Sequence, residues 1–345
     1  MNRILVTGGL GFVGSNVTVS LLNSGYDVII IDSLINSSEE RLSDINNILR
    51  LCNSHKMGKL FFMKVDIRNS EDLNRTFLKY NEKYNPIKAV IHCAGIKSVE
   101  ESVSDPLTYW DINIRGTLSL LSIMKLHKCH TLIFSSSACV YSQNINTPVT
   151  EKSLLKPITP YGNTKLSIEL MIEDLHKSEP GIWRISNLRY FNPAGSNIEG
   201  LLGEDPKNTP TNLFPIILDV LNKKLDKLHI YGNNWPTKDG TCIRDFIHIL
   251  DLSEAHLATL NYLLQNKPQI LILNIGTGLG TSVLEVVNTF NEIDDVNVPF
   301  QFDKKRKGDL PFMVACNNLA ITTINWHPKR TIKQICIDCL KTINR

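Results

Sequence analysis

The sequence predicts an α/β fold, in which a doubly wound parallel sheet is followed by a smaller mixed C-terminal subdomain. Three observations support this prediction. Strand-like and helix-like periods alternate through the first half of the chain, the strand-like runs are apolar on both faces, and a glycine-rich turn joins the first strand to the first helix. Strands that are apolar on both faces and separated by helices form parallel sheets covered by helices on either side.

The expected elements follow in order along the first half of the chain. Short apolar, β-branched runs predict strands at residues 4–7, 27–31, 60–65, 89–92, 131–135 and 182–188. Helical spacing is clearest at residues 11–23, 70–83, 106–127 and 161–176. After residue 188 the alternation weakens, and residues 192–241 are rich in Pro, Gly and Asn. We therefore expect a first domain over 1–190 and a second over 191–345, interleaved because a segment around 243–275 returns to the first.

The composition is that of a globular protein and excludes several classes of function. The chain has 345 residues, 42% of them hydrophobic, and a formal net charge of +3. A chain this apolar can bury enough surface to fold, which excludes intrinsic disorder. The near-balance of charge argues against a broad face for binding polyanions, so we expect no nucleic-acid partner.

Neither the membrane nor a metal is expected as a partner. No run reaches the roughly 18 consecutive apolar residues of a membrane span, and the N-terminus lacks the pattern of a signal peptide, so we expect a cytoplasmic protein. The eight cysteines are scattered through apolar runs, which is typical of reduced core residues. Cys336 and Cys339 form a CxxC pair in an amphipathic run without a second pair, which favours helix packing over a metal site.

A glycine-rich turn over residues 7–14 (TGGLGFVG) follows the first strand and opens the first helix. Backbone amides at such a helix start can face a pyrophosphate, and side chains at the glycine positions would block its approach. Asp32 ends the second strand, where an acidic side chain can accept hydrogen bonds from a ribose and repels a 2′-phosphate. Glycine turns are common on their own, but this context predicts a Rossmann-type site for NAD rather than NADP. Asp66 and Ile67 follow the third strand. They either border the adenine of the cofactor or only mark the end of the strand.

Tyr161 and Lys165 are four residues apart on a predicted helix that begins at Thr159 and Pro160, so both side chains lie on one helical face. A free phenol titrates near ~10 and is a base at neutral pH only where a neighbouring cation favours its ionised form. Lys165, together with the positive ring of NAD⁺, would supply that field. Ser137 follows the fifth strand, where its hydroxyl could hydrogen-bond the same substrate oxygen.

The Tyr-x-x-x-Lys spacing is common by chance, and the chain contains a second instance. Tyr84 and Lys88 share the spacing, but Pro86 lies between them and the next strand begins at about residue 89, so no helix is expected there. Lys165 could itself be an ordinary surface lysine. Its position on the helix after the fifth strand favours the site, because ligands of open sheets gather at the carboxyl ends of strands.

In this order, the glycine turn, the serine run and the Tyr161-x-x-x-Lys165 pair resemble the extended short-chain dehydrogenase/reductase superfamily. Within it the sequence is similar to the UDP-glucose 4-epimerase (UDP-galactose 4-epimerase) family over nearly the whole chain. The similarity is densest at residues 7–15, 134–141, 188–195, 202–215 and 231–249. The last three of these stretches lie outside the general dinucleotide pattern and make the resemblance specific.

The resemblance implies reversible 4-epimerisation of UDP-glucose and UDP-galactose, an isomerase reaction of galactose metabolism that passes through a transient 4-keto sugar and NADH. Tyr161 would take the proton of the 4-hydroxyl of the sugar, Ser137 would assist, and Lys165 would hold the nicotinamide ribose and tune Tyr161. Retained NAD would act as a catalyst. Similar enzymes are homodimers through helices that correspond to 106–127 and 161–176.

The resemblance also implies two sets of binding residues. Besides Tyr161 and Lys165, the positions that match NAD contacts are Gly8, Gly11, Phe12, Val13, Gly14, Asp32, Asn36, Ser37, Asp66, Ile67, Ala94, Gly95, Lys97, Asn113 and Phe191. Besides Lys97, Ser137 and Tyr161, the positions that match the nucleotide-sugar site are Asn192, Asn212, Leu213, His229, Tyr231, Arg244, Arg306 and Asp309. Guanidinium groups form paired hydrogen bonds with phosphate oxygens, so Arg244 and Arg306 suit a diphosphate, and Asp309 suits the uridine ribose. The alternative for Arg306 is a solvated charge in the basic run 304–307.

Other interpretations stay open. Met313 occupies a position that contacts the sugar in the family, and its intermediate size leaves UDP-N-acetylglucosamine 4-epimerase activity, alone or as a second specificity, open. Cys93 stands where the family often has an aromatic or other apolar residue. A nucleotide-sugar dehydratase or decarboxylase would need an added carboxyl acid near Ser137, and residues 137–140 (SACV) contain none. A non-catalytic NAD-binding sensor tends to lose the Tyr/Lys pair, and a one-way dehydrogenase would release NADH.

Overall fold

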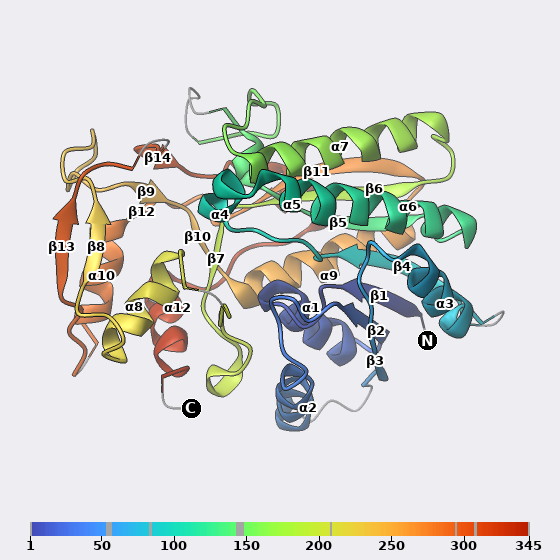
Figure 1. Cartoon of the computed structure of the whole chain (residues 1–345), viewed down its shortest axis with the longest axis horizontal. Helices are drawn as coiled ribbons and strands as arrows, with labels where there is room; N and C mark the ends of the chain where they lie inside the picture. Colours follow the sequence, from blue (N-terminus) through green and yellow to red (C-terminus); the bar gives the residue numbers. More distant parts are fainter. Residues whose placement is uncertain are drawn as a thin grey trace. The chain divides into compact units, whose positions relative to one another are not determined.

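The computed structural model describes residues 2–52, 57–82, 85–142, 148–207, 209–293, 295–306 and 309–343 (Figure 1). The chain forms two compact units. The first comprises Met1–Val140, Pro157–Arg189 and Ser253–Leu273, and the second comprises Tyr141–Lys156, Tyr190–Leu252 and Asn274–Arg345. The expected division places the boundary at residue 190, with a return to the first domain around 243–275. The chief difference is that residues 141–156, which have no clear strand or helix period, belong to the second unit. Among the described residues, no helix is both long and apolar enough to cross a membrane.

The first unit is built on a seven-stranded sheet with the strand order β11-β6-β5-β4-β1-β2-β3. Its strands are β1 (Arg3–Thr7), β2 (Asp27–Asp32), β3 (Leu60–Lys64), β4 (Ile87–His92), β5 (Thr131–Ser137), β6 (Arg184–Tyr190) and β11 (Gln269–Ile275). The registers from β3 through β5 are parallel. The strand order reverses between β1 and β4, and open sheets of this kind bind ligands outside the carboxyl ends of their strands at such a point.

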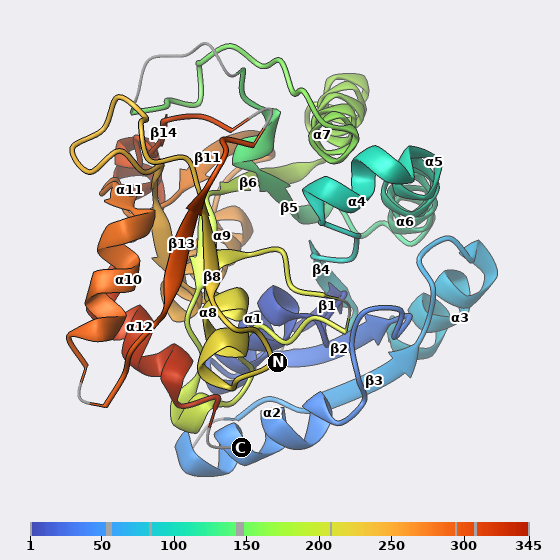
Figure 2. The ribbon, with the colours of Figure 1, turned by 60° about the vertical axis from the view of Figure 1, so that its left-hand side comes forward.

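Helices cover both faces of this sheet, which confirms the doubly wound fold (Figures 1 and 2). One face carries α3 (Ser70–Tyr80), α4 (Val99–Ser104), α5 (Pro106–Tyr109), α6 (Gly116–Leu126) and α7 (Pro160–Ser178). The other face carries α1 (Phe12–Asn23), α2 (Arg41–Cys52) and α9 (Ile249–Gln265). The strands between them are buried as predicted: Leu5, Ile29 and Phe134 are fully inaccessible to solvent.

The serine run lies inside a strand, which corrects the expectation that Ser137 follows the fifth strand. β5 extends to Ser137, and Ser135, Ser136 and Ser137 are all buried. Polar residues are tolerated at these buried positions because they form hydrogen bonds within the unit, as described below. The strand therefore ends at the candidate catalytic hydroxyl itself.

Two helices also differ from their predicted form. The segment 106–127 is helical, but a π-helical turn, Trp110–Arg115, separates α5 from α6. The helix expected over 70–83 ends at Tyr80, where the side-chain oxygen of Asn81 accepts a hydrogen bond from the N–H of Ile87 (3.0 Å). Tyr84 lies outside the described residues, and Lys88 is in β4, so Lys88 is not on a helix.

The second unit contains three small sheets within the described residues, with the orders β10-β7, β12-β9-β14 and β13-β8. Their strands are β7 (Asn192–Ala194), β8 (Leu228–Tyr231), β9 (Ile243–Arg244), β10 (Phe246–His248), β12 (Thr281–Ser282), β13 (Phe300–Asp303) and β14 (Phe312–Met313). The helices are α8 (Leu213–Leu221), α10 (Val283–Asn291), α11 (Asn318–Ile324) and α12 (Ile332–Leu340). A separate apolar core joins α8, α10 and α12, and it includes Cys336 and Cys339. This confirms the packing interpretation of the CxxC pair.

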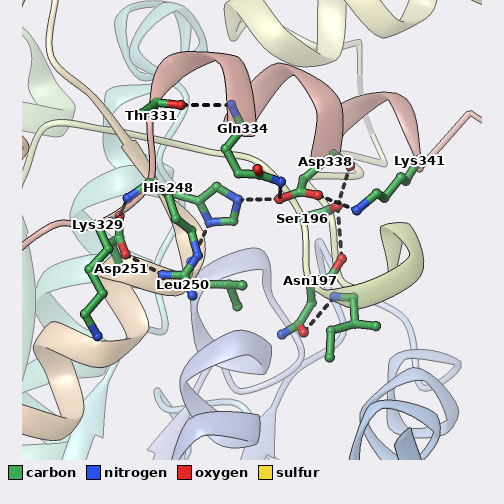
Figure 3. Close-up of polar contacts among 12 residues, drawn as sticks. Ser196, Asn197, His248, Leu250, Asp251, Lys329, Thr331, Gln334, Asp338 and Lys341 are labelled. Carbon is green, nitrogen blue, oxygen red and sulfur yellow. Dashed lines mark hydrogen bonds and ion pairs between the residues drawn. The ribbon is translucent and has the colours of Figure 1, made fainter. Parts of the chain in front are cut away.

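A buried polar cluster fastens α12 within the second unit (Figure 3). The N–H of Leu250 donates to Nδ1 of His248 (3.1 Å), so Nε2 of His248 carries the proton that faces the Asp338 carboxylate at 3.1 Å. Gln334 and Lys341 donate to the same carboxylate at 2.9 and 2.6 Å. Burial alone would raise the pKa of Asp338, but the hydrogen bonds from His248, Lys341 and Gln334 hold it well below its ordinary value. The C-terminal helix is thus held by charge as well as by apolar packing.

Replacing Cys336 with serine should lower the free energy of unfolding by about 1–3 kcal/mol, since the new hydroxyl would be buried in an apolar core. Cys52→Ser, at a partly exposed position, should change it by less than about 0.5 kcal/mol. Urea denaturation followed by circular dichroism measures both variants. Equal losses in the two variants, or destabilisation of the wild type by a metal chelator, would contradict the packing role.

Candidate active site

The glycine turn between β1 and α1 has no room for side chains. Gly8 has a φ of +64°, and a Cβ there would lie 2.7 Å from the backbone nitrogen of Ala94. A Cβ at Gly14 would lie 2.2 Å from the carbonyl oxygen of Gly8, and one at Gly11 would lie 3.2 Å from the same oxygen. α1 begins at Phe12 and Val13, and no side chain of the described residues caps it. Its first amides are therefore available to an anion.

Asp32 lies at the carboxyl end of β2, as expected, and organises the loops around the turn. Its carboxylate accepts hydrogen bonds from the N–H of Leu10 (3.0 Å), the N–H of Leu34 (2.9 Å) and the hydroxyl of Ser37 (2.7 Å). A carboxylate has about four acceptor positions, so capacity remains for a ligand hydroxyl. Asn36 is exposed on the same loop.

Asp66 and Ile67 follow β3 and have partners within the first unit. Arg68 donates to the Asp66 carboxylate at 2.6 Å, and this hydrogen bond lowers the pKa of Asp66. Ile67 packs beneath Gly116, where a Cβ would lie 2.6 Å from its Cδ1. In the structure the Asp66 side chain is therefore directed to Arg68.

Asn113 connects the loop after β4 to α7, and it sits in the π-helical turn. Its side-chain oxygen accepts from the N–H of Ile96 (3.0 Å), and its Nδ2 donates to the carbonyl of Ile96 and to Oγ1 of Thr164 (both 3.1 Å). Gly95 has a φ of +150°, and a Cβ there would lie 2.9 Å from Oδ1 of Asn113. On the same loop, the Lys97 ammonium lies 5.9 Å from the centroid of the Phe12 ring.

A buried histidine that sequence reasoning missed links this loop to the glycine turn. Oγ1 of Thr7 lies 2.7 Å from Nδ1 of His92 and accepts from the N–H of Ala94 (3.1 Å). Nε2 of His92 lies 2.8 Å from Oγ1 of Thr117, which donates its own proton to the carbonyl of Asn113. Burial, with a contribution from Lys165, lowers the pKa of His92 to about 3, so the ring is neutral. A lone histidine in a strand gives no sequence signal for such a role.

Tyr161, Lys165 and Ser137 come together as predicted, on α7 and at the end of β5. α7 begins as expected, with the Thr159 hydroxyl accepting from the N–H of Gly162 (3.1 Å). The ammonium of Lys165 donates to the carbonyl of Ser135 at 2.9 Å and lies 5.8 Å from the centroid of the Tyr161 ring. All three candidate side chains are buried.

Burial dominates the titration of this set. It lowers the pKa of Lys165 to about 8, against the opposing charges of Cys93, Cys139 and Glu169. It raises the pKa of Tyr161 well above that of a free phenol, and a hydrogen bond from Ser137 opposes this rise. In the chain by itself, desolvation therefore dominates the titration of Tyr161. More positive charge must face the phenol before it ionises near neutral pH.

In the second unit, four of the expected substrate residues contact one another in two pairs, Arg306 with Tyr231 and Arg244 with Asp309. The guanidinium of Arg306 lies 3.6 Å from the centroid of the Tyr231 ring, so Arg306 packs on an aromatic face despite its basic run. Arg244 donates to the carbonyl of Leu310 at 2.7 Å and lies 3.5 Å from the Asp309 carboxylate. Met313 is paired with Arg244 in the β9–β14 register.

The remaining expected residues of the second unit also have polar partners. Nδ1 of His229 lies 2.6 Å from Asp303, and Asn212, which precedes Leu213 at the start of α8, donates to Glu204 at 2.7 Å. The N–H of Phe191 donates to the carbonyl of Ile275 (3.3 Å), and Nδ2 of Asn192 donates to the carbonyl of Asp245 (3.0 Å).

Asp245 was not predicted, yet it orders the backbone beside Arg244. Its buried carboxylate accepts from the N–H and hydroxyl of Thr277 (both 2.7 Å), from the N–H of Gly278 (2.9 Å) and from the N–H of Ala315 (3.1 Å). These donors are distant in sequence, so no local pattern could reveal them.

Known proteins of one family are similar to this chain in sequence and in structure. The sequence model of the NAD dependent epimerase/dehydratase family matches residues 4–276. The chain is 41% identical to UDP-glucose 4-epimerase 1 of Oryza sativa subsp. japonica, covering 98% of this chain and 93% of that protein. It is 41% identical to UDP-glucose 4-epimerase of Bacillus subtilis (strain 168), covering 97% and 95%. The crystal structure of UDP-glucose 4-epimerase from Bifidobacterium longum in complex with NAD⁺ and UDP superposes with a TM-score of 0.91 at 37% identity, covering 99% of this chain and 98% of that one.

Replacing Gly14 with alanine should weaken NAD binding at least about tenfold, or ~1.4 kcal/mol, because its Cβ would collide with the Gly8 carbonyl and displace the turn. Gly181→Ala is the matched control, since a Cβ there meets nothing within 4 Å. Isothermal titration calorimetry of protein freed of nucleotide measures both affinities. Equal affinity in the two variants would show that the turn does not hold the cofactor.

Proposed function

The chain belongs to the NAD-dependent epimerase/dehydratase family, and on that premise we propose that it interconverts UDP-glucose and UDP-galactose by 4-epimerisation, a step of galactose metabolism. The observation that carries the proposal is the buried set of Tyr161, Lys165 and Ser137 at the carboxyl end of the sheet. The relatives named as UDP-glucose 4-epimerases support the substrate, since the chain matches them along nearly its whole length.

NAD fits the first unit as its cofactor. The collisions that a Cβ would make at Gly8 and Gly14 mark a backbone cradle of the kind that a pyrophosphate approaches closely. Asp32 retains acceptor capacity beside that cradle and favours a ribose without a 2′-phosphate. The other proposed NAD contacts are the family-matched positions given above. When bound, NAD supplies the reversible oxidation of the sugar at C4.

The proton of the 4-hydroxyl is handled by the chain itself. Tyr161 accepts this proton in one direction and returns it in the other, because a reversible reaction uses the same group as base and as acid. Ser137 hydrogen-bonds Tyr161 and orients the shared substrate oxygen. Lys165, held by the carbonyl of Ser135, keeps a positive charge beside the phenol below pH ~8 and loses it above. Burial of the set excludes water from the exchange.

The nucleotide sugar is assigned to residues of the second unit. Arg244 and Arg306 bind the diphosphate, because planar guanidinium groups match its oxygens, and the contact of Arg306 with Tyr231 supports this role. Asp309 binds the uridine ribose. The family-matched positions Asn192, Asn212 and His229 complete the proposed contacts, with Leu213 beside them. Met313, paired with Arg244, is the position at which acceptance of an N-acetyl group is decided.

We also propose that the protein is cytoplasmic, on the support of its cysteines. None of the eight forms a disulfide in the structure. Eight cysteines kept as thiols are typical of a reducing compartment.

Changing Tyr161 to phenylalanine should reduce turnover by about 10²–10⁴-fold, the usual contribution of a general acid–base group, while NAD binding survives. Tyr80→Phe is the control, because Tyr80 is as buried as Tyr161, both at 8% exposure, but it lies at the end of α3 and packs against Phe61 of β3. Proton NMR of each protein with UDP-galactose measures formation of the gluco isomer.

The same NMR assay with UDP-N-acetylgalactosamine tests the second specificity. A wild-type protein that forms no gluco isomer from either substrate would refute the proposal. Stoichiometric release of NADH would instead identify a one-way dehydrogenase, and full activity of Tyr161→Phe would exclude the assigned base.

We further propose a homodimer formed through α4 to α7. Large apolar side chains are exposed along these neighbouring helices, and they include Val103 (64%), Leu107 (79%), Leu118 (53%) and Leu170 (52%). Packing against the sheet does not account for this exposed stripe. A second copy of the same helices would cover it by two-fold symmetry.

The double variant Leu107→Glu/Leu170→Glu should be monomeric in sedimentation velocity at concentrations where the wild type is a dimer, because it places charges in the apolar contact. Leu78→Glu, at an equally exposed leucine on α3, should leave the dimer intact. A monomeric wild type, or identical behaviour of the two variants, would reject this interface.

A further inference from the structure

Glu169 and Arg189 form an ion pair that is almost completely buried in the first unit. Glu169 lies on α7 one turn after Lys165 and two turns after Tyr161, so the three side chains share one helical face. Arg189, on β6, donates from Nε to Oε1 at 3.0 Å and from Nη2 to Oε2 at 2.6 Å. The exposed fractions are 1% for the Arg189 side chain and 5% for that of Glu169.

Stability alone does not account for this pair, since buried ion pairs are often no better than apolar side chains of the same volume. Glu169 has a third partner that points to another role. The hydroxyl of Ser136 donates to Oε1 of Glu169 at 2.5 Å, and Ser136 is itself fully enclosed. The carboxylate therefore joins α7, β6 and the carboxyl end of β5.

Ser136 lies between Ser135, whose carbonyl holds Lys165, and the proposed catalytic residue Ser137. The carbonyl of Ser135 holds the ammonium of Lys165 at 2.9 Å, and Ser137 hydrogen-bonds Tyr161. A displacement of Ser136 along or across the sheet would move both neighbours, because the three residues are consecutive in one strand. Positional errors of about 1 Å at a reacting group can lower rates by two orders of magnitude.

We propose that Glu169, clamped by Arg189, is a positioning residue for the reaction: through Ser136 it fixes the strand end that holds Lys165 and carries Ser137. The inference rests on the proposed function, in which Tyr161, Lys165 and Ser137 act on the 4-hydroxyl. Glu169 acts through these residues and not on the sugar itself.

Glu169 also contributes to the electrostatic environment of Lys165. The groups that face the ammonium are Glu169 and Tyr161 from α7, His92 at the end of β4, Cys93 directly after it, and Cys139 after β5. Burial lowers the pKa of Lys165, and Cys93, Cys139 and the charge of Glu169 oppose that lowering. Loss of this charge would leave the positive charge of Arg189 unbalanced by Glu169 and lower the pKa of Lys165 further. Since an ammonium is lost as pH rises through its pKa, the active cation would disappear at lower pH.

The test compares three NAD-loaded proteins with the wild type: Glu169→Gln, the neutral double variant Glu169→Gln/Arg189→Gln, and the control Glu173→Gln. Glu173 is an exposed carboxylate one turn further along α7, paired with Lys177. Ionisation of Lys165 is read from the NMR shift of lysine labelled with ¹³C at Cε and assigned against Lys165→Met. This readout needs no turnover. The kcat of epimerisation is measured over the same pH range.

Glu169→Gln should lower the titration midpoint of Lys165 by about one pH unit and move the alkaline limb of kcat with it. The double variant should return both towards the wild type, because the net charge of the pair is again zero, and Glu173→Gln should change neither. A folded Glu169→Gln protein with an unchanged Lys165 midpoint and an unchanged kcat would overturn the inference.

Ser136→Ala keeps the inference testable where Glu169→Gln does not fold, since it removes only the hydrogen bond to the strand. It should lower kcat about tenfold with KM within about twofold, as expected for a misplaced reacting group. An unchanged kcat would overturn the positioning role. Failure of the proposed function would appear separately, as a wild-type protein without epimerase turnover at any pH.

Discussion

The site depends on one constraint, which is that α7 buries the polar side chains of Tyr161, Lys165 and Glu169 on a single face. Each needs a partner there, because an unpaired polar or charged group inside a protein is strongly destabilising. The end of β5 supplies them through the carbonyl of Ser135, which holds Lys165, and the hydroxyl of Ser136, which binds Glu169. The serine run is therefore as much a part of the candidate site as the residues proposed to handle the proton.

The same burial determines the chemistry. Desolvation lowers the pKa of Lys165 to about 8 and raises that of Tyr161, so the chain alone holds a neutral phenol beside an ammonium whose charge is easily lost. In the proposed function, the additional positive charge of bound NAD⁺ would change this balance and would tie the base to the presence of the cofactor. The net charge of +3 carries no information about this, because the relevant charges are local. The second unit uses charge in the same local way, with Arg306 held on the ring of Tyr231 and Arg244 near Asp309.

Short-range rules predicted much of the fold and part of the site. The alternation of strand and helix periods gave the doubly wound sheet, and local spacing gave the glycine turn, the Thr159 cap and the Tyr161/Lys165 face. The features that were missed are set by contacts between distant segments. His92 links Thr7 to Thr117 across 85 and 25 residues of sequence, and Glu169 meets Arg189 from a separate strand. No local pattern distinguishes such residues from ordinary polar ones, because their partners become neighbours only in the folded chain.

The central claim is that Lys165, reinforced by NAD⁺, turns a buried phenol into a base. The most direct measurement is the tyrosinate absorbance of the NAD-loaded protein as a function of pH, with the signal of Tyr161→Phe subtracted. The account predicts that Tyr161 ionises clearly below the ~10 of a free phenol and that Lys165→Met raises its midpoint. Wild-type and Lys165→Met proteins that titrate together, at or above the value of a free phenol, would contradict it.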